Sequence, residues 1–138
     1  MKVITLYRPW AYWVIWNWKT IETRIHNKFA ILKGETIGIH AGKFWDPDAI
    51  KAADSFLTPN QKAETLIMYK EGKLPGGRIL GTAHVDDHRA LSWDDSRKAL
   101  IICPPDLRYG LILSDIKQFN TPLPAEGHQG VWYFQIKN

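Results

Sequence analysis

Three charged residues in one short stretch, Lys19, Glu22 and Arg24, have side chains that could bind a phosphate or transfer a proton. The stretch from Lys19 to His26 alternates apolar and polar residues, which is typical of a β-strand and places Glu22 and Arg24 on one face. A lysine beside a glutamate can act as a general acid–base pair, and a carboxylate can orient a lysine or arginine on a phosphate. The same residues could instead form a surface ion pair of little energetic value.

A second group of polar residues, His40 and Lys43, follows a second alternating stretch. The alternation places His40 on the face opposite to Ile39 and Ala41, away from the core. A lone histidine is more often a hydrogen-bonded structural residue than a catalyst. His40 would reach Lys19 only if the two stretches lay close together in the fold, so its role stays open.

Other reactive patterns predict no metal site and no cofactor. His84, Asp86 and His88 share one strand face, but successive side chains on that face diverge by about 7 Å, too far for one ion. No glycine-rich phosphate loop is present. The single cysteine, Cys103, excludes an intrachain disulfide and favours a cytoplasmic location. No apolar stretch approaches the roughly 20 residues of a membrane span, so no membrane association is expected.

The elements that must position these residues form a mixed pattern that predicts one α+β domain over residues 1–138. Predicted strands cover residues 2–6, 19–26, 36–41, 78–86, 109–119 and 131–136. A predicted helix covers residues 9–16, a second begins at 46–48, and a third begins at 58–59 and closes at Gly72. Gly77 and Gly81 predict a bend or bulge, so we expect a small mixed β-barrel with helices packed on it.

The first predicted helix is apolar on every side. One arc holds Ala11, Val14 and Ile15, and the opposite arc holds aromatic residues, among them Trp13 and Trp16. Three interpretations stay open: a helix wedged between the barrel and the later helices, an interface of a homodimer, or a platform on which nucleobases stack.

The positive charge of the chain is concentrated near this helix. The net charge is +4, yet the first 45 residues hold seven Lys or Arg against two Glu, and five of the seven tryptophans. A basic surface beside exposed aromatic rings is typical of proteins that bind nucleic acid.

Several short motifs together resemble the ASCH domain, a branch of the PUA-like superfamily. They are R-P-W-A at 8–11, K-T-I-E-T-R at 19–24, I-G-I-H-A-G-K at 37–43, G-T-A-H-V-D at 81–86 and G-H-Q-G-V-W at 127–132. The resemblance covers nearly the whole chain. It implies a PUA-like β-barrel with flanking helices and a basic cleft that binds RNA or other nucleic acid.

The resemblance also implies which residues line that cleft: Trp10, Lys19, Glu22, Arg24, His40 and Lys43, with Gln129 and Trp132 closing it. Some single-domain members hydrolyse RNA or remove an acyl group from a modified cytidine. The members that remove the acyl group have a threonine nucleophile where this chain has Glu22, and Thr20 and Thr23 are offset from that place.

Our first functional hypothesis is therefore a domain that binds RNA or single-stranded nucleic acid, with Lys19, Arg24 and Lys43 on phosphates and Trp10 against a base. The second is a hydrolase of RNA or a modified nucleoside, with Lys19, Glu22 and His40 as catalytic residues. The third is a protein-interaction module that uses the aromatic helix face.

Overall fold

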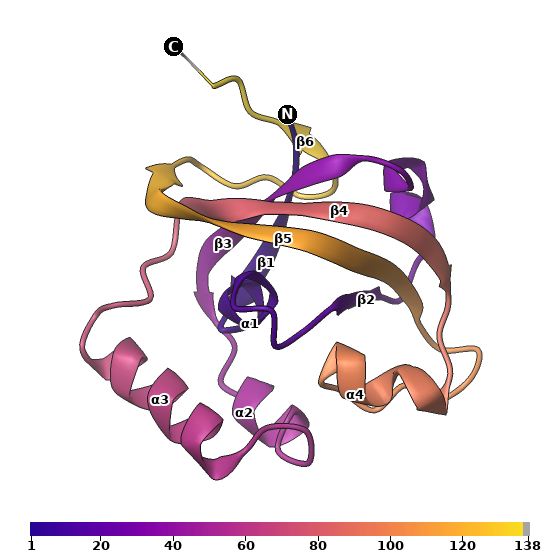
Figure 1. The fold of residues 1–138 in the computed structure, drawn as a ribbon, viewed down its shortest axis with the longest axis horizontal. Helices are drawn as coiled ribbons and strands as arrows, with labels where there is room; N and C mark the ends of the chain where they lie inside the picture. Colours follow the sequence, from indigo (N-terminus) through magenta and orange to yellow (C-terminus); the bar gives the residue numbers. More distant parts are fainter. Residues whose placement is uncertain (137–138) are drawn as a thin grey trace.

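A single mixed β-sheet organises the computed structural model, which describes residues 1–136 (Figure 1). Its strands are β1 (Lys2–Arg8), β2 (Ile21–Arg24), β3 (Thr36–Trp45), β4 (Arg78–Ala90), β5 (Tyr109–Pro124) and β6 (Trp132–Tyr133). The α-helices are α1 (Trp10–Ile15), α2 (Ala49–Ala52), α3 (Pro59–Lys70) and α4 (Ser96–Ala99). Two 3₁₀ turns, η1 (Lys28–Leu32) and η2 (Trp93–Asp95), complete the described elements. The mixed α+β architecture predicted from the sequence is confirmed.

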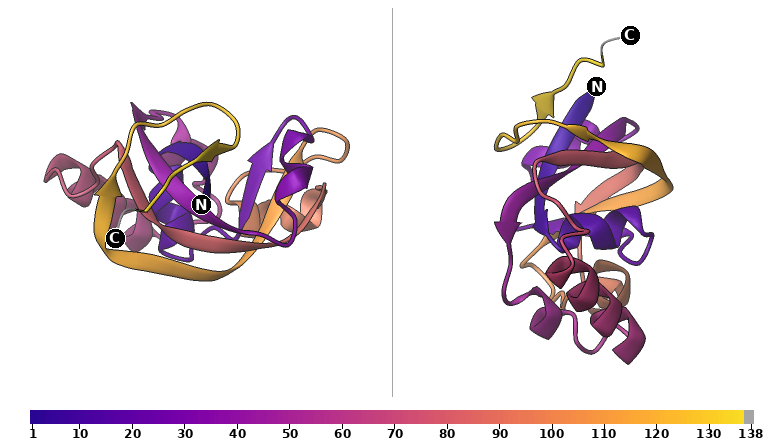
Figure 2. Two further views of the ribbon diagram at one scale, coloured as in Figure 1. Left: turned by 90° about the horizontal axis from the view of Figure 1, so that it is seen from above. Right: turned by 90° about the vertical axis from the view of Figure 1, so that its left-hand side faces the viewer.

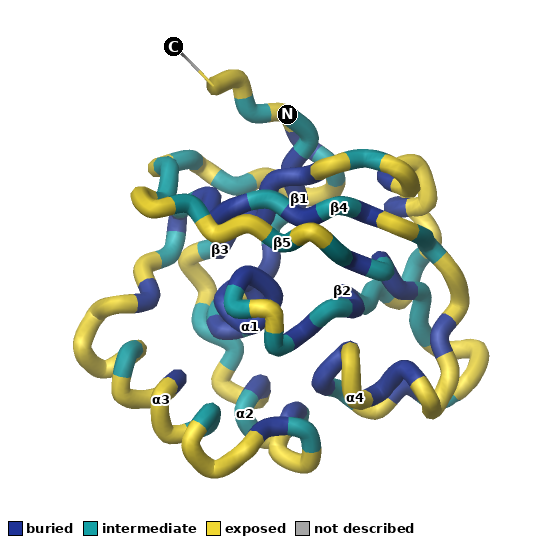
Figure 3. Tube along the Cα trace, in the orientation of Figure 1, coloured by how far each residue is buried: buried dark blue, intermediate teal, exposed yellow. Residues whose placement is uncertain are grey.

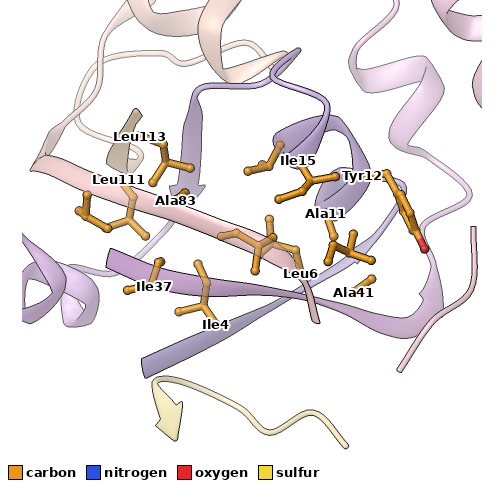
Figure 4. Close-up of a cluster of buried hydrophobic side chains, with 14 of the residues drawn as sticks. Ile4, Leu6, Ala11, Tyr12, Ile15, Ile37, Ala41, Ala83, Leu111 and Leu113 are labelled. Atoms are coloured by element: carbon orange, nitrogen blue, oxygen red, sulfur yellow. The ribbon is translucent and has the colours of Figure 1, made fainter. Parts of the chain in front are cut away.

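Strand β1 lies at the centre of the hydrophobic core. Val3, Ile4 and Leu6 are buried, and the strand pairs with β3 in parallel and with β6 antiparallel. Its apolar side chains pack with those of β3, β4, β5 and α1, as Figure 4 shows for Ile4 and Leu6. Burial of these side chains fixes the position of β1, and therefore of the residues around it.

Helix α1 is wedged between the sheet and the later helices, which confirms one of the three interpretations. Tyr12 packs against the sheet core and Trp13 against α2. The indole Nε1 of Trp13 donates a hydrogen bond to Thr65 Oγ1 on α3, at 3.1 Å. Tyr12 and Trp13 are buried, so they provide neither a platform for bases nor a surface for a dimer. Trp16 is half-buried.

The long strands β4 and β5 curve along their length, as Figure 2 shows. Their pairing shifts register between Ile79 and Gly81, and again between Thr82 and His84 and between Val85 and Asp87. A side chain at position 81 would lie 2.0 Å from the carbonyl oxygen of Lys117, so only glycine fits there. The bend predicted from the glycines is therefore confirmed.

The sheet is open, so the predicted small mixed β-barrel is not confirmed. In the order β2-β5-β4-β3-β1-β6, strands β2 and β6 are the edges and do not pair with each other. Strand β2 faces β1 across a gap, which a side chain spans: Nη2 of Arg24 donates to the carbonyl oxygen of Thr5 at 3.3 Å. The side chain of Arg24 thus lies between β2 and β1, where a closed barrel would need backbone hydrogen bonds between the two strands.

Most element boundaries predicted from the sequence agree with the structure to within a few residues, but β2 is shorter than predicted. It ends at Arg24, and Ile25, which lies inside the predicted strand 19–26, is 76% exposed. Gly72, predicted to close the helix that begins at 58–59, has a positive φ, and Thr58 caps α3 where that helix was predicted to begin. Cys103 is buried.

The main core and the helical layer differ in exposure. Figure 3 shows the buried residues concentrated in the sheet and α1, while α3 is mostly exposed. Across residues 1–136, none of the helices has the length and apolar character needed to span a membrane.

The buried position of Trp13 predicts a large effect on stability. Trp13→Ala is expected to lower the free energy of unfolding by about 3–5 kcal/mol, because it leaves a cavity between α1 and α2. The control, Trp93→Ala, removes a side chain that is 58% exposed. It should change the free energy of unfolding by less than about 0.5 kcal/mol. Urea unfolding followed by circular dichroism measures both. Equal effects of the two substitutions would contradict the wedged position of α1.

Candidate functional site

A groove of about 1650 Å³ lies between β1 and β2 and is bordered by the segment 124–131. Seven of the eight site residues expected from the sequence line it: Trp10, Lys19, Glu22, Arg24, His40, Lys43 and Gln129. Trp132 is not a lining residue. The groove therefore lies where the open sheet leaves β1 and β2 facing each other without pairing together.

The carboxylate of Glu22 is the centre of a buried ion cluster. Its side chain is 6% exposed, its Oε1 lies 3.7 Å from Lys19 Nζ, and its Oε2 accepts a hydrogen bond from Arg24 Nη1. Each carboxylate oxygen thus has a cationic partner. Removing either partner would leave an uncompensated buried charge, so this cluster differs from the surface ion pair that the sequence also allowed.

Lys19 is almost fully buried, at 1% exposure. Its Nζ donates to the carbonyl oxygen of Ala99 and lies 5.0 Å from the centre of the Trp10 ring, a cation–π contact. Burial lowers the pKa of Lys19 to about 8, against the opposing effect of the negative charge of Glu22. Lys19 is therefore a proton donor and acceptor matched to mildly alkaline pH, but it is too deep to contact an exposed phosphate directly.

Arg24 connects the ion cluster with both walls of the groove. Its guanidinium donates to Glu22, to the carbonyl oxygen of Thr23 and, across the groove, to that of Thr5. It also lies 5.1 Å from the centre of the Phe29 ring. These contacts hold the half-buried side chain of Arg24 in one place between β1 and β2.

His40 is held by hydrogen bonds on both ring nitrogens. Nε2 lies 2.8 Å from the carbonyl oxygen of Ala125, which only accepts, so this nitrogen carries the proton. Nδ1 lies 3.1 Å from Thr5 Oγ1, which in turn accepts from the indole Nε1 of Trp132 at 3.0 Å. Burial lowers the pKa of His40, which favours this neutral form. In this geometry His40 anchors the segment 124–131, and a catalytic role for it stays a prediction.

The segment 124–131 passes closely over His40. A side chain on Gly127 would lie 2.7 Å from Cε1 of His40 and 3.0 Å from Thr5 Oγ1, so glycine allows the close approach. Trp132, which was expected to close the groove directly, is 8% exposed and packs edge-on against His40. Trp132 therefore contributes to the groove indirectly, through its hydrogen bond to Thr5 and its contact with the His40 ring.

The groove carries an excess of positive charge. Its basic side chains are Lys19, Arg24, Lys28, Lys43, Arg78 and Arg108, and its acidic ones are Glu22, Asp46 and Glu126. Lys28 and Lys43 are exposed, whereas Arg78 and Arg108 are half-buried. The balance favours an anionic ligand.

Two aromatic rings are available at the groove. Trp10 is half-buried, and its Nε1 donates to Asp46 Oδ2 at 2.8 Å, which fixes the plane of the indole. Tyr7 is 57% exposed and packs edge-on against Phe44. A fixed, partly exposed ring can stack against a nucleobase.

Sequence reasoning missed several lining residues: Tyr7, Lys28, Arg78, Arg108 and His128. Lys28 belongs to the basic first third of the chain, and Tyr7 directly precedes the R-P-W-A motif, so both had a weak signal. No sequence signal pointed to Arg78 or Arg108, because only the tertiary fold brings them to the groove.

Within the described residues, 1–136, no group of three or more His, Cys, Asp or Glu side chains could hold a metal ion. His84 Nε2 lies 3.8 Å from Asp86 Oδ1 on one face of β4, and no third ligand joins them.

No protein-family model matches this sequence, and no curated protein matches it. Comparison of the fold with solved structures does give matches. The crystal structure of ASCH from Zymomonas mobilis aligns with a TM-score of 0.58, covering 97% of this chain and 87% of that chain, at 13% identity. Structures of two single-residue mutants of the same protein also give a TM-score of 0.58 at 13% identity, with 87% and 89% of those chains covered.

The structural neighbours of this chain are therefore ASCH proteins, and the ASCH resemblance inferred from the sequence motifs is confirmed by the fold. At this level of identity the likeness shows the fold alone.

The lowered pKa of Lys19 predicts a pH-dependent stability. In the unfolded chain the pKa returns to 10.5, so between about pH 8 and 10.5 the unfolded chain binds more protons than the folded one. The contribution of Lys19 to the free energy of unfolding therefore rises with pH across this window, by about 3 kcal/mol in total. Urea unfolding of wild type and Lys19→Met at several pH values isolates it. The free energy of unfolding of wild type, minus that of Lys19→Met, should grow as the pH rises through this window. A difference that does not change with pH would contradict the buried position of Lys19.

Proposed function

We propose that the groove binds single-stranded nucleic acid, with RNA as the first candidate. The observation that carries this proposal is the combination in one groove of an excess of basic side chains with the partly exposed rings of Trp10 and Tyr7. Positive charge draws in the sugar–phosphate backbone, and aromatic rings hold bases that are not already stacked in a duplex.

The size of the groove favours a polymer over a single small molecule. Small-molecule sites usually measure about 300–1,000 Å³, whereas this groove measures about 1650 Å³. Its lining residues come from β1, β2, β3 and the segment 124–131, so several nucleotides could contact different elements at once.

The burial of each residue assigns it a role in this proposal. Lys28 and Lys43 are exposed and contact phosphates. Arg24 is half-buried and contacts the ligand while its ion pair with Glu22 holds it in place. Lys19 acts through Glu22 and Trp10, because its ammonium group is buried.

A second candidate function is hydrolysis of RNA or of a modified nucleoside. The specific observation in its favour is a lysine with a pKa of about 8 beside a buried carboxylate in the groove. Because Lys19 is buried, Glu22 would accept the proton of an attacking water or hydroxyl group and pass it to neutral Lys19, which becomes the ammonium ion beside it.

Binding of nucleic acid predicts a strong dependence on salt. Wild type should bind a single-stranded oligouridylate at low salt and lose affinity steeply as salt is added. In Lys28→Gln/Lys43→Gln, two phosphate contacts are removed, so the slope of log affinity against log salt should fall by about 1.4. Fluorescence anisotropy with a labelled oligonucleotide measures this slope.

The matched control is Lys98→Gln/Lys117→Gln, which removes two exposed charges outside the groove and should leave the slope near that of wild type. Absence of binding at low salt, or equal effects of the two double variants, would overturn the proposal for this groove.

The hydrolase candidate predicts turnover that depends on Lys19. Incubation with RNA and with acylated nucleosides, analysed by mass spectrometry, should show product for wild type and at least a hundredfold less for Lys19→Met. The wild-type rate should rise with pH up to about 8, as Lys19 loses its proton. Lys43→Gln serves as the control for loss of binding. Absent turnover, or turnover unchanged in Lys19→Met, would exclude this mechanism.

A further inference from the structure

Arg108 is a basic residue in the groove whose side chain forms no hydrogen bond or ion pair with the described residues, 1–136. It lies in the loop before β5 and lines the groove together with Lys19 and Glu22. Its Nε is buried and has no hydrogen-bond partner. The ion pairs found among residues 1–136 do not include Arg108. A buried donor without a hydrogen-bond partner lowers the stability of the fold by about 1–3 kcal/mol. A ligand that accepts a hydrogen bond from Nε of Arg108 would remove this cost.

The other unsatisfied arginine nitrogen in the structure shows the contrast. Nε of Arg8 is also buried without a partner, but both of its Nη atoms donate to backbone carbonyls, of Leu74 and Lys43. The guanidinium of Arg8 therefore has a structural role in joining segments, and that of Arg108 has none.

The charges around Arg108 do not balance. Lys19, Arg24 and Arg108 are three cations that line the same groove, and Glu22 is the carboxylate paired with the first two. The positive charge of Arg108 acts on Lys19 in the same direction as that of Arg24, disfavouring the ammonium form. The group thus has an excess of about two positive charges in a poorly solvated place, which a dianion would neutralise.

We infer that Arg108, together with the free donors of Arg24, binds a terminal phosphate of the nucleic acid. This inference rests on the proposed function. A phosphomonoester carries about −1.5 to −2 charges near neutral pH, which matches the excess, whereas a phosphodiester carries only about −1. The planar fork of an arginine pairs with two phosphate oxygens at once.

The experiment compares three forms of one short oligouridylate: with a 5′-phosphate, with a 3′-phosphate, and with hydroxyl groups at both ends. Wild type should bind one phosphorylated form about tenfold more tightly than the form without a terminal phosphate, as expected for a hydrogen bond to a charged group. Arg108→Gln should lose this preference, and Arg108→Lys should keep part of it.

The matched control is Arg97→Gln, which removes an exposed arginine outside the groove and should keep the full preference. Circular dichroism shows whether Arg108→Gln is folded, and the Nε–H resonance of Arg108 in wild type gives a second measurement, since it should shift when inorganic phosphate is added.

The outcomes separate this inference from the proposed function. Binding of all three forms with equal affinity, or a preference that survives in Arg108→Gln, overturns the inference and leaves the proposed function standing. If no form binds, the proposed function fails. An Arg108 resonance that does not respond to phosphate counts against the inference in either case.

Discussion

The buried carboxylate of Glu22, held between Lys19 and Arg24, is the interaction on which the rest of the site depends. A charge this deep is tolerated only with paired and hydrogen-bonded partners. Lys19 reaches it from the turn after α1 and also donates to the carbonyl oxygen of Ala99, the last residue of α4. Arg24 reaches it from β2 and extends across the groove to the backbone of Thr5. One carboxylate thereby fixes the relative position of β2, α4 and the central strand β1.

The same arrangement explains why the sheet stays open. Strand β2 pairs only with β5, and between β2 and β1 stands the guanidinium of Arg24 instead of a backbone ladder. On the other side of the groove, Thr5 connects Trp132 and His40, and His40 anchors the segment 124–131 through Ala125. The groove thus lies between two strands that are joined by a side chain instead of a backbone ladder, and it is there that we propose the ligand binds.

Strand periodicity predicted that Glu22 and Arg24 share one face, and the ASCH resemblance implied that Lys19 lines the same cleft. The same periodicity also predicted that His40 points away from Ile39 and Ala41. It did not predict what His40 meets there, because Ala125 is 85 positions away in the chain. Arg108 and the open sheet edge could not be predicted for the same reason: both depend on how strands distant in sequence are placed. The aromatic helix was ambiguous because its pattern fits a buried helix and an interface equally well, and the packing of Trp13 against α2 decides between them.

The central claim is that the groove between β1 and β2 binds single-stranded nucleic acid. Nuclear magnetic resonance of ¹⁵N-labelled protein, titrated with a single-stranded oligouridylate, tests it most directly by following tryptophan and arginine side-chain N–H signals. The account predicts that the signals of Trp10 and Arg24, in the groove, shift with the added oligonucleotide, while those of the exposed Trp93 and of Arg89, which is paired with Asp95, stay unchanged. Shifts of Trp93 or Arg89 with unchanged signals from Trp10 and Arg24 would contradict it.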